Sequence, residues 1–390
     1  MTNPSRKAGS VVLVKASAAV GAALLAVTLL AVGAVAAQQP RIANARVASQ
    51  PAGSSLAQSF RALVASQTEP AWIGYTVPVV DSQRIMCCFN GDSSWSSGGV
   101  VMSDSSSCCR ACRLEPAADG TSMTTRSAAP GQSQPSVVRL EGSERMVVLF
   151  RIAERAVDRI RVFSEDCELD AGGRTVTWLE GVRPADSIAL LESFVAPAQD
   201  RRDRTSDGAI SAIALHSDAA ADAALERLVA PSQPESVRKK VTFWLGNARG
   251  ARGLATLRRV LKEDPSFEVQ KSAVFGVSQS HEKDAYHVLL GLARNDANPR
   301  VRAEAIFWLG QKAGQKASAA ITERIEQDPD TEVKKRAVFA LSQMPKDEGV
   351  PLLINVARNN PNPAVRKQAM FWLGQSKDPR ALALFAEILK

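Results

Sequence analysis

The chain has 390 residues, of which 45% are hydrophobic, and a formal net charge of +8. This length leaves room for two domains after a targeting segment. The basic excess belongs to the C-terminal part, 231–390, where it would attract an acidic partner. Nucleic acid is disfavoured as that partner, because the N-terminal residues predict export from the cytoplasm. The chain also lacks the alternating aromatic and basic residues of known nucleic-acid-binding motifs.

The first 37 residues have the pattern of an export signal. Arg6, Lys7 and Lys15 precede an uncharged run, 16–37, that ends in small residues. A basic start, an apolar stretch and small residues at the end are typical of a secretory signal peptide. The run is also long enough to span a bilayer, so an uncleaved N-terminal membrane anchor is the alternative. We therefore expect the rest of the chain in the periplasm or outside the cell, released or held at the inner membrane by residues 16–37.

A linker with a short helix is predicted over residues 38–69, followed by a small β-rich domain over 70–183. Short segments rich in Val, Ile and Phe, with partial alternation, predict its strands. These segments are residues 72–80, 136–140, 146–152, 157–163 and 175–179. The segments 146–152 and 157–163 are expected to pair as a hairpin.

All six cysteines of the chain fall within this domain. They are Cys87, Cys88, Cys108, Cys109, Cys112 and Cys167. An even number in an exported chain predicts disulfides that staple a small domain. The most economical pairing sets Cys87 and Cys88 against Cys108 and Cys109, and joins Cys112 to Cys167. Cys109 and Cys112 also form a C-x-x-C motif, which is typical of a redox pair or of half a zinc site.

The C-terminal part, 184–390, is predicted to be an α-solenoid with clear copies from residue 234. A phenylalanine recurs every 32 residues, at Phe243, Phe275, Phe307, Phe339 and Phe371. A fixed period of this length indicates stacked helix pairs that share one core. In the last copy Val365, Ala369 and Leu373 lie on one stripe of the first helix. Gly374 is expected to end that helix in a left-handed conformation, and Gly246 and Gly310 are expected to do the same in their copies.

Two weaker patterns precede the clear copies. Residues 184–195 have helical periodicity and are expected to cap the solenoid where it joins the β-rich domain. Residues 203–229 are expected to form a degenerate first copy. The solenoid is therefore predicted to begin directly after the last strand.

Two stretches of the repeat carry a family resemblance. They are Asn362-Pro363-Ala364-Val365-Arg366 with Trp372-Leu373-Gly374, and Asn298-Pro299-Arg300-Val301-Arg302 with Trp308-Leu309-Gly310. In these residues the chain resembles the HEAT family, and more narrowly the HEAT-like repeats named after phycobilisome lyases, over roughly half its length. The resemblance implies a right-handed solenoid. It leaves function open, because the family includes scaffolds, inhibitors, lyases and a hydroxylase.

The resemblance also raises an enzymatic alternative. Deoxyhypusine hydroxylase is similar in being a HEAT-like solenoid, and it holds two irons with repeated His-Glu pairs, whereas this chain has one such pair, His281-Glu282. We therefore expect no catalytic residue, metal or cofactor. An iron-dependent oxidoreductase of the hydroxylase type and a thiol redox protein acting through Cys109 and Cys112 remain alternative functions.

The candidate partner-binding residues lie on the first helix of each copy. They are Phe307, Phe339, Phe371, Lys334, Lys335 and Arg336. The phenylalanines point away from the core stripe, so they either pack against the neighbouring copy or form an exposed aromatic row. Trp244, Trp308 and Trp372, which alternate with small residues, are predicted to be core. The basic cluster is either a solvated rim or a surface for an acidic protein or an anionic envelope surface.

The sequence thus predicts a scaffold without catalysis that binds a partner protein in the cell envelope. Surface complementarity would be the mechanism, with the second helix of each copy lining the concave face and each copy adding a few contacts.

Overall fold

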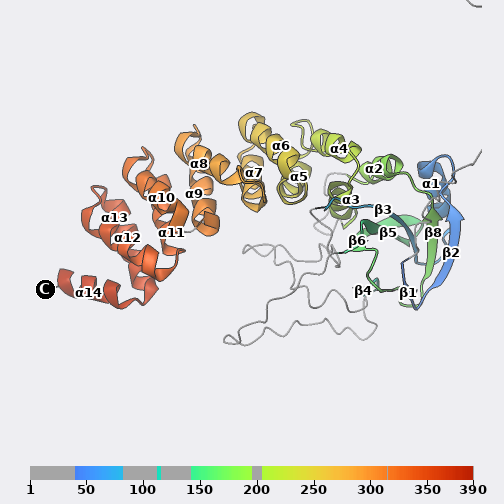
Figure 1. Cartoon of the computed structure of the whole chain (residues 1–390), viewed down its shortest axis with the longest axis horizontal. Helices are drawn as coiled ribbons and strands as arrows, with labels where there is room; N and C mark the ends of the chain where they lie inside the picture. Colours follow the sequence, from blue (N-terminus) through green and yellow to red (C-terminus); the bar gives the residue numbers. More distant parts are fainter. Residues whose placement is uncertain (1–39, 82–111, 116–141, 196–203, 314, 390) are drawn as a thin grey trace, which may run out of the picture. The chain divides into compact units, whose positions relative to one another are not determined.

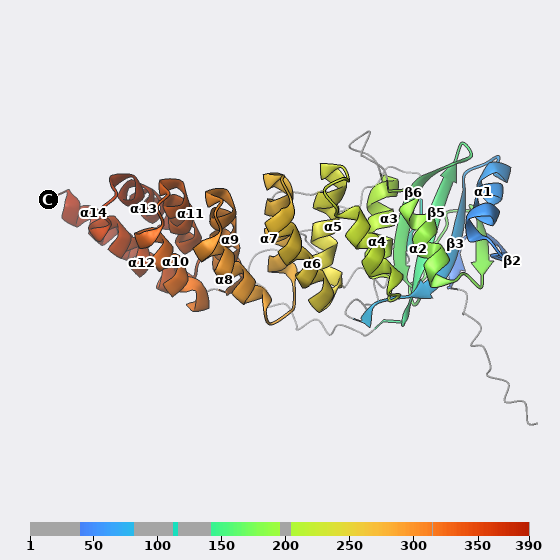
Figure 2. The same cartoon turned by 90° about the horizontal axis from the view of Figure 1, so that it is seen from above.

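The computed structural model describes residues 40–81, 112–115, 142–195, 204–313 and 315–389. Within these ranges a small β-sheet region is followed by pairs of helices that succeed one another along the chain (Figures 1 and 2). The predicted leader, 1–37, and the predicted strand 136–140 lie outside the described residues. Among the helices of the described ranges, none combines the length and the apolar character that a membrane crossing requires.

The larger sheet has five strands in the order β2-β8-β3-β5-β6. The strands are β2 (Arg46–Pro51), β8 (Thr175–Glu180), β3 (Ala71–Pro78), β5 (Arg145–Ala153) and β6 (Ala156–Ser164). The pairing of β5 with β6 is antiparallel, which confirms the predicted hairpin. At its tip Glu154 and Arg155 have φ angles of 53° and 58°, as a tight hairpin turn requires.

Residues 38–69 contribute more than the predicted linker with a short helix. The helix is present as α1 (Leu56–Ser66), but residues 46–51 also form the edge strand β2. Both β2 and β3 run parallel to β8, which lies between them. The strand β2 is hard to recognise in the sequence because five of its six side chains are exposed and show no core pattern; its position depends on backbone pairing with β8.

A second, smaller sheet covers one face of the larger one. It has the order β1-β7-β4, with parallel strands β1 (Ile42–Ala43), β7 (Leu169–Asp170) and β4 (Cys112–Arg113). The core on this side includes the buried side chains of Trp72, Phe163 and Trp178 together with Leu169 of β7. This core is separate from the one on the opposite face.

The opposite face of the larger sheet packs against helices. Phe60 of α1, Phe150 of β5, Ile188 of α2 (Pro184–Glu192) and Ile213 of α3 (Arg204–Leu215) belong to one buried cluster, which continues through the helix pairs. Helix α2 contacts α3 and the following helix α4 (Ala220–Leu228), as expected of a cap. The sheet region and the first copy therefore share a core, whereas the sequence predicts two domains divided at residue 184.

The helical part has the repeat architecture that the 32-residue period predicts. After α3 and α4 the pairs are α5 (Glu235–Ala248) with α6 (Gly250–Glu263), α7 (Phe267–Gln279) with α8 (Ala285–Asn295), α9 (Pro299–Ala313) with α10 (Gln315–Gln327), α11 (Thr331–Ser342) with α12 (Lys346–Asn359), and α13 (Pro363–Ser376) with α14 (Pro379–Ile388). The first helix of each pair contacts the first helix of the next. This stacking confirms the α-solenoid and the degenerate first copy.

The turns between copies share one device at a 32-residue spacing. In each, a side-chain oxygen accepts a hydrogen bond from the backbone N–H two residues later, at 2.9 to 3.0 Å; the residues are Asp264, Asp296, Asp328 and Asn360. Buried arginines pair with two of these carboxylates, Arg238 with Asp264 and Arg302 with Asp328. Burial raises the pKa of Asp328, but hydrogen bonds from Arg302 and from the Asp330 N–H outweigh it and hold the pKa below its usual value. The shared hydrogen bond marks the end of each of these copies, and the two buried pairs add to it in two of them.

The prediction that glycines end the first helices is wrong. Gly246, Gly310 and Gly374 lie inside α5, α9 and α13, and Lys377, with φ 53°, takes the left-handed conformation after α13. A Cβ atom added to Gly246 would lie 1.9 Å from the carbonyl oxygen of Gly276. This glycine is therefore required because α5 and α7 approach each other closely there.

Candidate functional site

A continuous row of aromatic rings runs along the first helices of five copies. We call it the aromatic ladder; in order of contact its members are Trp244, Phe243, Phe275, Trp308, Phe307, Phe339, Trp372 and Phe371. Neighbouring ring centroids are 4.8 to 5.9 Å apart along the whole row. Aromatic pairs at such distances stabilise one another beyond the area they bury.

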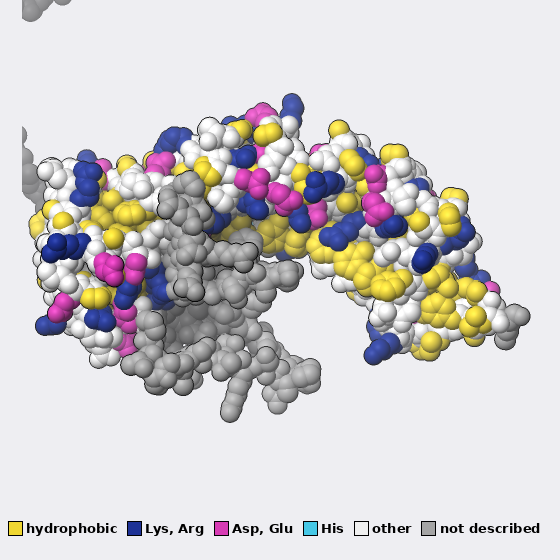
Figure 3. Space-filling view, turned by 180° about the vertical axis from the view of Figure 1, so that it is seen from behind, with side chains coloured by type: hydrophobic (Ala, Val, Ile, Leu, Met, Phe, Trp, Pro, Cys, Tyr) yellow, Lys and Arg dark blue, Asp and Glu magenta, His cyan; other side chains and the backbone are white. Residues whose placement is uncertain are grey.

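Helical spacing explains why the phenylalanines form a surface. In α11 the buried residues Val333, Ala337 and Leu341 mark the core stripe, and Phe339 lies two positions from the last two, on the opposite side. Phe371 is 53% exposed and Phe243 is 9% exposed, while the phenylalanines between them are half-buried. From behind, hydrophobic side chains form a band along the lower edge of the helical part, with Lys and Arg side chains beside it (Figure 3).

The ladder alternates between two kinds of step. Phe307 and Phe339 stack with their planes 1° apart, and the first two phenylalanines of the ladder stack at 18°. Between these stacked pairs Trp308 bridges to Phe275, and beyond them Trp372 bridges to Phe339. The tryptophans, predicted as core, pack against the core but are only half-buried and belong to the ladder.

The three predicted basic residues have different surroundings. The Arg336 guanidinium carbon lies 4.5 Å from the ring centroid of Phe307 and 5.3 Å from that of Phe339, a cation–π arrangement. Lys335 pairs with Glu332 at 2.7 Å. Lys334 Nζ donates to the carbonyl oxygen of Glu326, at the end of α10, at 2.9 Å. Of the three, Arg336 therefore lies on the ladder, and Lys334 fastens one copy to the one before.

Two polar rows flank the ladder on the same helices. One turn before the phenylalanines lie the basic residues Lys239, Lys240, Lys271, Lys335, Arg336 and Lys367, with Glu304 among them. One turn after them lies an amide in every copy: Asn247, Gln279, Gln311, Gln343 and Gln375. Residues three or four apart share a helix face, so both rows border the rings. Sequence reasoning missed the amide row, although its period of 32 residues would have revealed it.

This combination of side chains is suited to binding. The rings offer apolar area, the basic row favours acidic groups, and the amides both donate and accept hydrogen bonds. The candidate residues lie on the first helices of the copies, whereas the sequence predicts that the second helices form the binding face.

The remaining predicted sites fall mostly outside the described residues. Cys87, Cys88, Cys108 and Cys109 belong to that part, so the disulfides and the Cys109–Cys112 redox pair stay predictions. In β4, Cys112 pairs with Leu169, two residues after the buried Cys167. In the described ranges no three or more His, Cys, Asp or Glu side chains come together as a metal site, and His281 lies between α7 and α8.

The repeats match a known family. Residues 221–310 and 318–390 match the family model of HEAT repeats. The match begins in α4 and covers the later copies, so these residues form HEAT repeats, as the sequence resemblance implies. None of the curated proteins compared with the chain matches it.

Several solved structures are similar to part of the chain. The structure of YibA from E. coli is 24% identical, with a TM-score of 0.32, over 49% of this chain and 71% of that one. Human deoxyhypusine hydroxylase in complex with glycerol is 19% identical, with a TM-score of 0.24, over 52% and 90%. The complex of CpcE and CpcF of phycocyanin lyase from Nostoc sp. PCC7120 is 19% identical, with a TM-score of 0.27, over 53% and 81%. The assignment of HEAT repeats depends on the family model and on the repeat itself.

Proposed function

We propose that the protein is an exported scaffold that holds a partner protein on the aromatic ladder, without catalysis. HEAT repeats suggest a scaffold or protein-binding role. The observation that carries the proposal is the ladder itself, since its rings border solvent along five successive copies. Apolar rows of this length on a protein surface mark interaction sites.

The flanking rows favour a partner with apolar and acidic side chains. Aromatic residues and arginines supply most of the binding energy in protein interfaces, and Arg336 on Phe307 and Phe339 combines both. The neighbouring lysines would attract carboxylates and speed association. An anionic envelope surface is the competing target for the same lysines.

The cell envelope is the proposed location. Its support is the N-terminal pattern of basic residues followed by the uncharged run 16–37. Cell fractionation, with Edman sequencing of the recovered protein, tests it. Recovery from the cytoplasmic fraction alone would refute the proposal of export.

The test of the ladder compares two exposed hydrophobic positions. The full chain captures its partner from envelope extract, mass spectrometry identifies it, and the dissociation constant is measured with purified partner. Phe339→Ala is expected to weaken binding at least about 30-fold, as truncation of a central aromatic residue does. Leu382→Ala, at a 63% exposed position on α14 outside the ladder, is the matched control and is expected to leave binding unchanged.

Thermal melting separates a binding role from a structural one. Phe339 is half-buried, so its truncation is expected to cost less than the roughly 3 to 5 kcal/mol of a core phenylalanine. If Phe339→Ala melts far below the parent chain, Phe371→Ala takes its place, because Phe371 is 53% exposed at the end of the row. Unchanged affinity in both variants would refute the proposal. Binding of phosphatidylglycerol vesicles in place of a protein, lost in Lys335→Gln and Lys367→Gln, would assign the surface to the membrane.

A further inference from the structure

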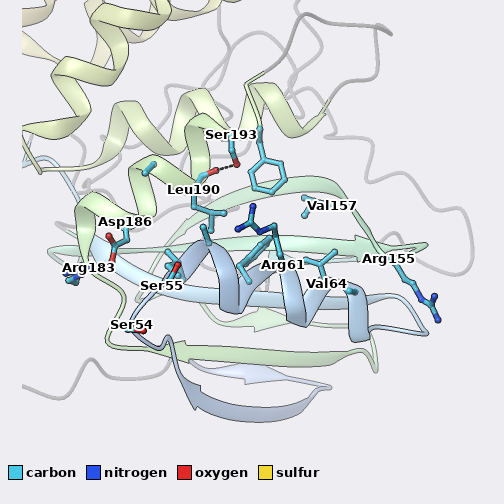
Figure 4. A pocket seen from close by; sticks show the side chains of 16 residues that line it. Ser54, Ser55, Arg61, Val64, Arg155, Val157, Arg183, Asp186, Leu190 and Ser193 are labelled. Atoms are coloured by element: carbon cyan, nitrogen blue, oxygen red, sulfur yellow. Dashed lines mark hydrogen bonds and ion pairs between the residues drawn. The ribbon is translucent and has the colours of Figure 1, made fainter.

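A groove with a volume of about 690 Å³ lies far along the chain from the ladder, between α1 and α2. Residues 54–65 form one wall and residues 183–194 the other, with Val157 of β6 beside them (Figure 4). The groove shares no residue with the aromatic ladder. Its volume is in the range of small-molecule sites, about 300 to 1,000 Å³.

The interior of the groove is apolar. Its lining includes Phe60, Val64, Val157, Leu190 and Phe194. The rings of Phe60 and Phe194 meet edge to face with their centroids 6.0 Å apart, which fixes the depth of the groove. Ser193, whose hydroxyl could otherwise add polarity, donates to the carbonyl oxygen of Leu190 at 2.6 Å.

Positive charge surrounds this apolar surface. Three arginines line the groove, Arg61, Arg155 and Arg183, against one carboxylate, Asp186. Arg183 pairs with Asp186 at 2.6 Å at one end, and Arg155 points outward at the other (Figure 4). The guanidinium of Arg61 rises from α1 toward α2, over the groove, and no described residue forms an ion pair with it. An anion entering the groove would therefore meet a guanidinium that no described carboxylate neutralises.

The length of the groove suits a chain-like ligand. The α1 wall runs from Leu56 to Ala65, about 14 Å at 1.5 Å per residue. A stretched alkyl chain of about twelve carbons spans the same 14 Å, at about 1.3 Å of advance per carbon–carbon bond.

We propose that this groove binds a linear amphipathic carboxylate of the fatty-acid type. The alkyl chain lies along the partly exposed Val64, Val157 and Phe194 in place of water, and the carboxylate accepts hydrogen bonds from the Arg61 guanidinium. Charge complementarity at Arg61 and the apolar lining together select such a ligand over a neutral or cationic one.

The test uses three probes with one tail and different head groups. Isothermal titration of the full chain compares dodecanoate, dodecanol and dodecyltrimethylammonium, each below the concentration at which it aggregates. Dodecanoate is expected to bind about tenfold more tightly than dodecanol, which is the usual effect of one charge-assisted hydrogen bond, and the cation more weakly than either. Arg61→Gln is expected to remove the advantage of dodecanoate over dodecanol.

Two tryptophan variants locate the site. Ala65 lines the groove, and Ala62 is an exposed residue of the same helix outside the lining. Ala65→Trp fills the groove and is expected to weaken dodecanoate binding more than tenfold, while Ala62→Trp, the matched control, leaves it unchanged. Phe339→Ala is also expected to leave it unchanged, which keeps this inference independent of the proposed scaffold function.

Three results would each overturn the proposal. They are the absence of dodecanoate binding, equal affinity for the three probes, and dodecanoate binding that persists in Ala65→Trp. Loss of partner capture in Ala65→Trp with no change in dodecanoate affinity would instead identify the groove as a protein interface.

Discussion

A buried histidine at the junction of the sheet and the first helix pair is predicted to make stability depend on pH. Tyr75 Oη of β3 lies 2.8 Å from Ser187 Oγ of α2, which lies 3.0 Å from His216 Nε2 at the end of α3. All three side chains are fully buried, and His216 Nδ1 has no hydrogen-bond partner among the described atoms. The pKa of His216 is lowered to about 4, mainly by burial and to a lesser extent by Arg249, against the opposing effect of Asp218.

The sign and size follow from the difference between the folded and unfolded states. An unfolded chain binds a proton on histidine below about pH 6.5, whereas the folded chain excludes that proton until the pH approaches 4. The contribution is therefore complete above pH 6.5 and is lost as the pH falls from 6.5 to 4. A pKa difference of about 2.5 between the unfolded and folded states, at about 1.4 kcal/mol for each pKa unit, makes the full loss about 3.5 kcal/mol.

Urea unfolding followed by tryptophan fluorescence at several pH values between 7 and 4 measures this loss. His216→Gln cannot titrate, so its free energy of unfolding is expected to lack the decline between pH 6.5 and 4 that the parent chain shows. The exposed His281→Gln is the matched control and is expected to retain the decline. A parent profile that is flat over this range, or an equal slope in His216→Gln, would refute the assignment of the decline to His216.

Two further predictions compare a buried position with an exposed one. Asp328→Asn leaves the buried Arg302 without its charged partner and is expected to lower the free energy of unfolding by about 3 to 5 kcal/mol. Glu387→Gln breaks an exposed pair and is expected to lower it by less than about 1 kcal/mol. Urea unfolding at pH 7 measures both. Equal costs would contradict the structural role of the turn. Gly246→Ala places a Cβ against a backbone carbonyl and is expected to lower the melting temperature. Gly291→Ala, inside α8, adds a Cβ that meets nothing within 4 Å and is expected to raise the free energy of unfolding by about 1 kcal/mol. An unchanged melting temperature in Gly246→Ala would mean that α5 and α7 are not in close contact.

The helical repeat could be predicted because its evidence is periodic and local. Val333, Ala337 and Leu341 show the 3.6-residue period of a helix, and the phenylalanines show the 32-residue period of the copies. The hairpin of β5 and β6 was also predictable, since both strands are rich in Val, Ile and Phe and a short turn separates them. Each of these features lies within one short window of sequence.

The features that the sequence did not reveal depend on contacts between distant segments. The strand β2 is held by pairing with β8, well over a hundred residues later, and its exposed side chains carry no core pattern. The role of Gly246 depends on the backbone of Gly276 in the next copy. Local sequence cannot show that contact, so it predicts instead that this glycine ends a helix. The junction of Tyr75, Ser187 and His216 joins residues from three elements, and none of them stands out alone.

The sequence identified only part of the candidate site, because the rest of that site also depends on contacts between separate segments. Periodicity identified Phe307, Phe339 and Phe371 as a row, but it could not distinguish packing against the neighbouring copy from exposure, and the structure shows both at once. The cluster at 334–336 looked uniform in sequence. Only helix geometry separates Arg336, on the rings, from Lys334, on the backbone of the preceding helix.

The structural unit of the ladder is two copies, or 64 residues, although the phenylalanine recurs every 32. Close approach of α5 to α7 depends on small residues, because a Cβ on Gly276 would lie 2.4 Å from the carbonyl oxygen of Thr242. At the equivalent contact of α9 with α11, a Cβ on Gly310 would lie 3.1 Å from that of Ala340, and at both contacts the phenylalanine rings stack directly. At the alternate contacts the tryptophan occupies the space instead and bridges the rings. Because both kinds of step keep neighbouring centroids within 6 Å, the surface stays continuous although the helices meet in two different ways, and a partner would meet stacked phenylalanine pairs separated by tryptophans.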